Sequence, residues 1–441
     1  MVLLRGAESG SPGPRVKRVL LLATTTGYQT RMFGDAAERL GVDLVFATDR
    51  CDVLDDPWRD RAIPVRFHDE DASVSAILEH AASQPINGVL VVGDRPTVVA
   101  ALAAQELRLT SHQPLAAAVS RNKLLTRERL RDCDLLRPWF FPTTVDADAK
   151  ELAQMIEFPC VIKPLTLSAS RGVMRADDRV AFVEAFERLR ALLASAEVRA
   201  ERVPDEGAYD TILVEGFIDG WEFALEGIMH HGALNALALF DKPDPLDGPF
   251  FEETIYVTPS TAPDAMQWDI LDAVARAAAA IGLTHGPIHA ECRVNSRGVY
   301  ILEVAARPIG GLCARSLRFQ RKGEGPLVSL EELLLRHALG ESPADWRREA
   351  AASGVMMIPI PRRGVCRAVT GLDEATAVPG IDEVQITAKT DQVLVPLPEG
   401  ASYLGFIFAH AATPDAVERS LRDAHARLRF TIDPELPMLQ S

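Results

Sequence analysis

The chain has 441 residues, of which 47% are hydrophobic, 25% are charged and 6% are aromatic, a composition typical of an ordered globular protein and not of a disordered or fibrous one. Its formal net charge of −15 repels phosphate backbones and argues against a general nucleic-acid-binding protein. A chain of this length exceeds one ordinary hydrophobic core, so we expect about three domains or subdomains.

Neither a membrane span nor a zinc site is indicated by the sequence. The apolar run at residues 19–23 is too short to cross a bilayer and predicts a buried strand, while the polar residues 1–14 predict a loose end. The six cysteines are scattered, without a Cys-x-x-Cys pair or the Cys/His spacing of a zinc site. We therefore expect a cytoplasmic protein with no membrane partner and no nucleic-acid partner.

The first unit, residues 15–120, alternates strand and helix patterns. These patterns predict strands at 19–24, 43–47 and 88–92 and helices at 31–40, 72–82 and 96–107. The βαβαβ order predicts a parallel sheet with helices on its faces. The turn at residues 24–28 lacks G-x-G-x-x-G, so a dinucleotide site after the first strand is not favoured.

The second unit, residues 121–218, places a lysine at the end of an apolar strand. The sequence predicts an opening helix, a strand at 160–163 that ends in Lys163, and a helix at 179–196. Small residues at 168–173 form a loop whose backbone N–H groups can approach phosphate oxygens, with the lysine as a point charge. The alternative for this segment alone is an ordinary surface loop beside a solvated lysine.

An apolar strand at residues 212–218 runs into a turn and is followed by the acidic stretch 220–226. A purine needs a flat apolar slot with backbone donors and acceptors at its edge, and a ribose needs an acceptor such as a carboxylate. This stretch offers both. The alternative is a connection between two subdomains that carries solvated acids.

The third unit, residues 219–340, contains two carboxylates twelve positions apart, Glu291 and Glu303. Strands are predicted at 222–229 and 233–240, followed by an amphipathic helix at 267–281 and an acidic hairpin. If the hairpin strands pair across the turn at 295–298, both carboxylates can hold one cation. Glu303, Ala305 and Arg307 share one face of a period-2 strand, which suits Mg²⁺ and a phosphate. The alternative is a solvated face or a cross-strand ion pair.

A polar, irregular stretch at about 340–354 separates a last unit, residues 354–441. This unit has predicted strands at 355–360, 365–370, 383–387 and 402–409 and a helix at 414–428, which is an α+β pattern. The apolar segment 403–408 is interpreted as core. The alternative for that segment is a strand that joins two copies into a homodimer.

The order of Lys123, Lys163, the small-residue loop, Glu215, Glu291, Glu303 and Arg307 resembles the ATP-grasp superfamily over residues 15–340. The resemblance is strongest in FPCVIKP, SRGV, ILVEGFIDGWEF and HAECRV…YILEVAARPIGG. Within the superfamily, Glu-x-Ala-x-Arg and the stretches at 251–259 and 402–409 resemble the L-amino-acid ligase group and related carboxylate–amine ligases.

This resemblance implies an ATP-grasp fold of mixed α/β and α+β type. Its expected parts are a Rossmann-like pre-ATP-grasp domain (15–120), a lid subdomain (121–218), a catalytic, metal-binding subdomain (219–340) and a C-terminal α+β subdomain (354–441).

The resemblance also implies a role for each matching residue. The α and β phosphates of ATP would contact Lys123 and Lys163. The loop that closes over the γ-phosphate would consist of Ser168, Ser170, Arg171, Gly172 and Val173. The adenine would be bordered by Glu215, Gly216, Phe217 and Ile218, and the ribose would face Glu222. Mg²⁺, with Mn²⁺ as an alternative, would be held by Glu291 and Glu303. Arg307 would steady an acyl phosphate, and Glu253 would face the amine substrate or an added metal.

Several residues depart from the family's pattern. Ala305 stands where many ATP-grasp enzymes have an asparagine metal ligand, and water or phosphate oxygen must then complete the Mg²⁺ shell. The phosphate loop has only one glycine, Gly172, and Tyr256 stands where related ligases often have a histidine. His289 is interpreted as a hydrogen-bonded structural residue, with substrate contact as the alternative. Lys242 is interpreted as part of a substrate lid or of a solvated loop.

The implied activity is ATP-dependent ligation of a carboxylate to an amine through an acyl phosphate, with release of ADP and phosphate. The expected substrates are small, most simply amino acids, and the product is an amide such as a dipeptide. One alternative is an ATP-grasp carboxylase or a purine-pathway-like ligase. Another is an ATP-binding regulatory module without catalytic activity.

Overall fold

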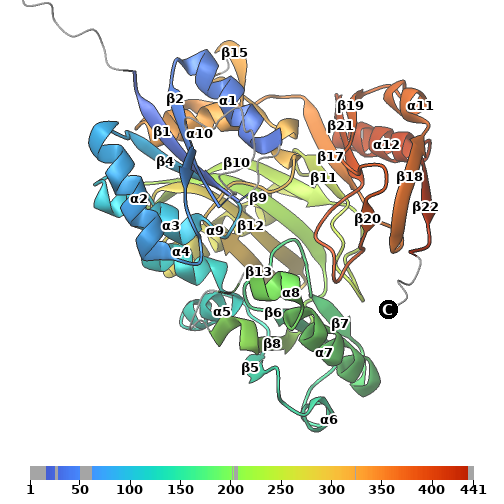
Figure 1. Cartoon of the computed structure of the whole chain (residues 1–441). Coiled ribbons are helices and arrows are strands. Elements are labelled where there is room, and N and C mark those ends of the chain that lie inside the picture. Colours follow the sequence, from blue (N-terminus) through green and yellow to red (C-terminus); the bar gives the residue numbers. More distant parts are fainter. Residues whose placement is uncertain are drawn as a thin grey trace, which may run out of the picture.

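The computed structural model describes residues 16–24, 28–49, 62–200, 202, 207–322 and 324–435. The predicted loose end at 1–14 and most of the predicted turn at 24–28 lie outside these ranges. Among the helices that the structure describes, none is long and apolar enough to cross a membrane. Figure 1 shows an N-terminal part, a lower part and a C-terminal part arranged around one large sheet.

The N-terminal part is a parallel sheet in the order β3-β2-β1-β4. Its elements are β1 (Arg18–Ala23), α1 (Tyr28–Leu40), β2 (Asp43–Thr48), β3 (Ala62–Pro64), α2 (Glu70–Ser83), β4 (Gly88–Val92) and α3 (Thr97–Glu106). All six predicted elements are confirmed. The three-residue β3 was not predicted because it is too short to show a pattern. Residues Val19 to Ala23 are all buried, as expected for a parallel strand covered on both faces.

Two helices, α4 (Pro114–Arg121) and α5 (Lys123–Arg131), lead into a four-stranded antiparallel sheet in the order β5-β8-β6-β7. Its elements are β5 (Phe140–Thr144), α6 (Ala149–Leu152), β6 (Cys160–Pro164), β7 (Met174–Ala176), α7 (Arg179–Leu193), α8 (Ala196–Ala200), the 3₁₀ turn η1 (Gly207–Asp210) and β8 (Thr211–Gly216). Phe182, Phe186 and Leu189 line one face of α7 and are fully buried against this sheet. The described residues from Lys123 to Gly216, which form the lower, teal-to-green part of the molecule in Figure 1, are called the lid below.

The central sheet has eight strands in the order β13-β12-β9-β10-β11-β17-β21-β19. Its first five strands are β9 (Trp221–His230), β10 (Ala233–Lys242), β11 (Ile255–Thr258), β12 (Gly286–Asn295) and β13 (Gly298–Ala305). Helix α9 (Asp264–Ile281) buries Ile270, Val274 and Ile281 against Ala290, Cys292 and Val304 of the hairpin. Because side chains alternate along a strand, Glu291 and Glu303, which are next to these residues in sequence, face the opposite side.

The C-terminal part extends the same sheet. Strands β17 (Ala352–Ile358), β21 (Gly405–Ala411) and β19 (Ile381–Ile386) continue from β11, and α12 (Pro414–His425) packs on them through Val417, Leu421 and Ala424. Because β21 pairs with β17 on one side and β19 on the other, the segment 403–408 belongs to the core and not to a free sheet edge. This finding removes the alternative of a dimer strand there.

Smaller elements complete the fold. One three-stranded sheet contains β14 (Arg318–Arg321), β15 (Glu324–Ser329) and β16 (Trp346–Arg348), next to α10 (Leu330–Ala338); another contains β18 (Gly364–Thr370), β20 (Val393–Leu394) and β22 (Arg429–Asp433). The remaining elements are α11 (Leu372–Thr376) and the 3₁₀ turns η2 (Cys313–Ser316) and η3 (Pro343–Asp345). The stretch 340–354, predicted to be irregular, thus holds η3, β16 and the first residues of β17.

Candidate active site

A cavity of about 710 Å³ is lined by the lid, the central sheet, the loop after β4 and residues near 401–403. Every predicted site residue lines it except Gly172, which lies between the lining residues Arg171 and Val173 and where an added Cβ would meet Leu189 and Pro164. The residues that the sequence placed in one site are therefore brought together. Their individual roles remain predictions.

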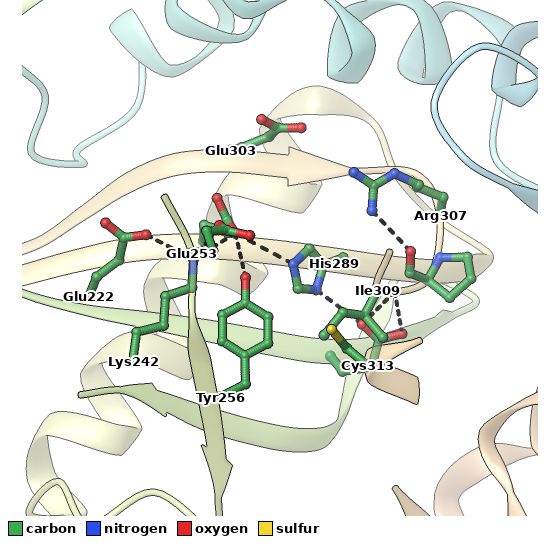
Figure 2. Close-up of polar contacts among 12 residues, drawn as sticks. Glu222, Lys242, Glu253, Tyr256, His289, Glu303, Arg307, Ile309 and Cys313 are labelled. Atoms are coloured by element: carbon green, nitrogen blue, oxygen red, sulfur yellow. Dashed lines mark hydrogen bonds and ion pairs between the residues drawn. The ribbon is translucent and has the colours of Figure 1, made fainter. Parts of the chain in front are cut away.

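The acidic hairpin forms as predicted, with Glu291 of β12 directly opposite Glu303 of β13 and the turn at 295–298 between the strands. Glu303 stands apart from the other acids in Figure 2, and its carboxylate lies 3.8 Å from Nζ of Lys123. Mg²⁺ prefers oxygen ligands and commonly retains several waters. Two cross-strand carboxylates that line a cavity fit this preference, even with Ala305 buried in place of a third ligand.

Glu291 also belongs to a second group, the Lys242 cluster, formed by Lys242, Glu222, Glu253 and Glu291. Nζ of Lys242 donates to Glu222 at 2.8 Å, to Glu253 at 2.7 Å and to Glu291 at 2.8 Å. The ammonium is also 4.8 Å from the ring centre of Tyr256, whose hydroxyl donates to Glu291 at 3.2 Å. Figure 2 shows these groups converging on one point.

The Lys242 cluster buries one ammonium among three carboxylates, and this arrangement shifts the pKa values of its members in different directions. Burial and the neighbouring charge of Glu291 raise the pKa of Glu253 to about 7. Burial alone would raise the pKa of Glu291, but the charge of Lys242 outweighs it and holds that pKa well below its usual range. Burial opposes the charge on Lys242, yet the three carboxylates raise its pKa well above the ordinary value.

One sequence interpretation is wrong, and a second residue has partners that the sequence did not predict. Lys242 belongs neither to a lid nor to a solvated loop: it ends β10, is 4% exposed and is neutralised by carboxylates. Glu222, expected to face the ribose, lines the cavity but is already bound by Lys242 and by Nε of Arg293 at 2.8 Å. Both differences arise because β9, β10 and β12 are neighbours in the sheet, which places these side chains on one face.

His289 is hydrogen-bonded, as its structural interpretation predicted, and it also lines the cavity; substrate contact stays a prediction. Its Nδ1 lies 3.2 Å from Glu226, and its Nε2 lies 3.7 Å from Glu291. Glu226 is fully buried and also accepts from the backbone N–H of Ile309 at 3.1 Å. Burial opposes the charge on His289, but hydrogen bonds to the two carboxylates raise its pKa to about 9. The His289 ring thus links Glu226 to Glu291.

The opposite charge arrangement occurs in the Glu215 cluster, formed by Glu215, Arg127 and Lys163. Arg127 is 2% exposed and forms two parallel bonds to the Glu215 carboxylate at 2.8 and 3.2 Å. Lys163 donates to the same carboxylate. Burial lowers the pKa of Lys163 to about 8, while the two cations overcome burial and lower the pKa of Glu215 to about 2. Arg127 was not recognised in the sequence, where its charged helix looks like an exposed one.

The phosphate loop packs against the rest of the protein in this structure. The N–H groups of Arg171 and Val173 donate within the loop, and that of Gly172 donates to the carbonyl of Pro398 at 2.8 Å. Those three N–H groups are therefore not directed at the cavity. Arg171 Nε donates to the carbonyl of Glu399 at 2.8 Å. The lid is thus joined to the C-terminal part, a contact that sequence reasoning missed.

Arg307, predicted to steady an acyl phosphate, extends from the end of β13 toward the N-terminal part. Its Nε donates to Asp94 at 2.7 Å, and both residues line the cavity. Burial opposes ionisation of Asp94, but the Arg307 guanidinium lowers the pKa of that carboxyl. Asp94 follows β4 at the carboxyl end of the parallel sheet, where polar residues of such sheets commonly bind ligands. That position was the one available signal for Asp94.

Comparisons with known proteins agree with this geometry. Three family models match in chain order: an ATP-grasp N-terminal domain at residues 34–110, an ATP-grasp domain at residues 156–316 and an L-amino acid ligase C-terminal domain at residues 356–433. These segments contain, respectively, most of the parallel sheet, most of the lid with the acidic hairpin, and the strands that extend the central sheet.

Whole-chain likeness points the same way. The crystal structure of an L-amino acid ligase from Bacillus licheniformis superimposes with a TM-score of 0.79 at 26% identity, covering 95% of this chain and all of that one. An uncharacterized protein of Sinorhizobium fredii is 22% identical over 95% of this chain and 84% of its own length. The alanine–anticapsin ligase of Bacillus subtilis is 29% identical, over 38% of this chain and 37% of its own length. The chain therefore carries ATP-grasp domains and an L-amino acid ligase C-terminal domain, and it resembles the L-amino-acid ligase and carboxylate–amine ligase group.

Proposed function

We propose that the protein is an ATP-dependent carboxylate–amine ligase that joins two small substrates, most simply amino acids, and releases ADP and phosphate. The supporting observation is the charge pattern of one cavity. Lys123, Lys163 and Arg307 offer cations to phosphate oxygens, while the Lys242 cluster offers an excess of carboxylates to a cation or an amine. An enzyme that must bind a polyphosphate and an ammonium group together needs both kinds of surface.

The reaction has two steps. A carboxylate oxygen of the first substrate attacks the γ-phosphorus of ATP, and the bond from that phosphorus to the β–γ bridging oxygen breaks, which gives an acyl phosphate and ADP. The amine nitrogen of the second substrate then attacks the acyl carbon. The carbon–oxygen bond to phosphate breaks, and the nitrogen loses a proton. The products are an amide and inorganic phosphate.

The cations have distinct tasks in the first step. Lys123 and Lys163 are point charges that bind phosphate oxygens of ATP, and Arg307 offers parallel donors that match a carboxylate or an acyl phosphate. These charges act in a partly closed cavity, where they stabilise negative charge more strongly than in water. When the substrate binds, the Arg307 guanidinium would either release Asp94 or donate to Asp94 and the substrate together.

Glu253 suits the proton transfer of the second step. Its pKa of about 7 leaves its carboxylate able to accept a proton from the amine near neutral pH. Lys242, donating to Glu253 at 2.7 Å, keeps that carboxylate oriented toward the cavity. The lid excludes water, which would otherwise hydrolyse the acyl phosphate in competition with the amine.

Mg²⁺ fits the Glu291–Glu303 pair, and Mn²⁺, with similar oxygen preferences, is the alternative. When bound, such an ion neutralises phosphate charge and orients the terminal phosphate for transfer.

The direct test measures ADP and phosphate release with Mg²⁺ and a panel of amino acids and other small carboxylates, singly and in pairs. Mass spectrometry of the products identifies the bond that is formed. We expect release that requires a particular pair, yields one condensed product and is lost in Glu303→Ala. ATP binding without release or a product for any pair would contradict the proposal and favour a regulatory module.

A further inference from the structure

Five of the ten histidines lie together, away from the ATP cavity. They are His230 and His231 at the end of β9, His285 before β12, His337 in α10 and His112 before α4, and none of them lines the large cavity. Strand β9 carries Glu222 near one end and His230 at the other, a separation of about 26 Å at about 3.3 Å per residue. This histidine cluster is not used by the proposed ligation.

The rings of this cluster are closely packed. Ring centres lie 4.5 Å apart for His230 and His231, 4.8 Å apart for His231 and His285, and 4.3 Å apart for His285 and His337. One ring nitrogen from each of His230, His231 and His285 lies within 4.8 Å of the other two. Tetrahedral zinc with bonds of about 2.0–2.1 Å places its nitrogen ligands roughly 3.3 Å apart. The three nitrogens must therefore move closer to reach that spacing, and the His231 side chain is exposed and not held in the core.

The chemistry of the cluster is that of a metal site and not of an ion-pair network. His285 is 6% exposed, and its Nδ1 has no hydrogen-bond partner among the residues that the structure describes. Burial and the neighbouring imidazoles lower the pKa of His285 to about 4 and that of His337 to about 3. The buried Nδ1 of His285 is thus available to a ligand.

Backbone and hydrogen-bond contacts hold the three nitrogens near one another. His231 has a left-handed φ of 51° in the tight turn between β9 and β10, and the next residue, Gly232, donates its N–H to the carbonyl of Thr284 at 2.8 Å. This bond ties the turn to the segment that carries His285. Nδ1 of His230 lies 3.2 Å from Nε2 of His337. Histidine ligands typically fix their orientation through a hydrogen bond of the second nitrogen, and His337 is the partner available to His230.

We propose that His230, His231 and His285 bind one divalent transition-metal ion of the zinc type, with His337 as a positioning residue for His230. Three imidazole nitrogens favour such an ion over Mg²⁺, which prefers oxygen ligands. The fourth position is left to water. The ion would fasten the β9–β10 turn to the start of β12 and, through His337, to helix α10.

The experiment uses the full chain, freed of metal with a chelator and kept in excess Mg²⁺ so that the carboxylate sites are occupied. Co²⁺ serves as the probe because its visible absorption reports tetrahedral nitrogen ligation. We expect one equivalent of Co²⁺ to give this absorption and Zn²⁺ to displace it. Glu303→Ala and His68→Asn, the latter removing a histidine outside the cluster, should keep it.

Two substitutions that the fold should tolerate each remove one of the proposed metal ligands. His231→Asn retains a residue that tolerates the left-handed turn, and His230→Gln removes a second imidazole. Each should weaken Co²⁺ binding more than about 100-fold, whereas loss of the orienting partner in His337→Gln should weaken it about 10- to 100-fold. Zn²⁺ should raise the Tm of the native protein but not that of His231→Asn. Absence of the Co²⁺ spectrum in the native protein, or an unchanged spectrum in both ligand variants, would overturn the proposal.

Discussion

The Lys242 cluster and the Glu215 cluster are charge-reversed arrangements in the same cavity. In the first, one buried ammonium is shared by three carboxylates; in the second, one buried carboxylate is shared by two cations. Each central group is at most 4% exposed. The central charge of each cluster is therefore paired. The Lys242 cluster still has an excess of negative groups, and the Glu215 cluster has an excess of positive groups.

The difference between the two clusters indicates which kind of ligand each end of the cavity suits. An excess of cations near the phosphate loop suits a polyphosphate, and an excess of carboxylates beside the acidic hairpin suits a metal ion and an amine. Burying unpaired charge is costly, so each cluster holds one countercharge that keeps the excess small before substrates bind. The two clusters should therefore respond differently when the shared lysine of the first or one of the two cations of the second is removed.

The largest effect is expected for Lys242→Met, which leaves three buried carboxylates without their shared cation. Removal of one partner from a buried ion pair typically costs about 3–5 kcal/mol, and we expect a loss of this size in the free energy of unfolding, with loss of ligation. Denaturant unfolding checks the first effect. The exposed control, Lys389→Met, should change that free energy by less than about 0.5 kcal/mol.

The double variant Lys242→Met/Glu253→Gln sharpens this test. Because it removes one of the three repelling charges together with the lysine, it should be more stable than Lys242→Met alone. If the free energies of unfolding change additively, so that the double variant recovers no stability, the carboxylates are not coupled through Lys242.

Removing charge from the other cluster should affect nucleotide use more than folding. Lys163→Met keeps the Arg127–Glu215 pair, so Glu215 retains a partner. Loss of a donor aimed at developing charge typically costs about 10²–10³-fold in kcat, and we expect a decrease of this size in ATP-dependent turnover. Steady-state kinetics checks it, with circular dichroism as the test of folding; near-native turnover would exclude Lys163 from phosphate binding.

The pH dependence should separate Lys163 from an arginine at the same position. Because its pKa is lowered to about 8, Lys163 loses its proton as pH rises above that value, and turnover should fall with it. In the same range the unfolded chain binds more protons than the folded one at this residue, so the Lys163 contribution to stability rises with pH. Unfolding is therefore not the cause of the loss.

In Lys163→Arg the charge persists at high pH. Whatever turnover this variant retains should lack the alkaline decline near pH 8, as shown by kcat/KM profiles of both proteins. A decline at the same pH in the variant would assign it to another group.

The smallest effect is expected at the surface contact that joins the lid to the C-terminal part. Arg188 forms a bidentate pair with Glu399, and the two side chains are 43% and 33% exposed. Exposed pairs contribute about 0.2–1 kcal/mol and are screened by salt. Arg188→Ala should therefore raise the KM for ATP by no more than about fivefold, with a smaller effect in high salt.

Short-range sequence patterns predicted many of the elements of this protein. They did not predict which residues far apart in the sequence pair with one another. The acidic hairpin was predicted because alternation and a turn lie within twenty residues, and the lysine at the end of β6 because its strand is continuous and apolar. In contrast, Arg127 binds a residue 88 positions away, and Arg307 binds one 213 positions away.

No local property of the chain marks such partners. Arg127 lies in a polar helix with basic residues in its last turn, and its burial depends on the lid strand and the hairpin that pack around it. Lys242 likewise ends a strand next to a loop rich in proline and aspartate, which resembles exposed structure until β9 and β12 are placed beside it. The family resemblance supplied roles for single residues but not their ion-pair partners.

The continuous eight-stranded sheet has a consequence for recombination between ligases. Strand β17 of the C-terminal part is paired residue for residue with β11, from Ile255 opposite Met356 to Thr258 opposite Ser353. A chimera cut between 340 and 352 would replace one side of this backbone ladder and require a foreign strand to adopt the same register. The segment after this cut is thus structurally coupled to β11, and exchange of substrate preference is better attempted by grafting cavity-lining loops than by swapping that segment.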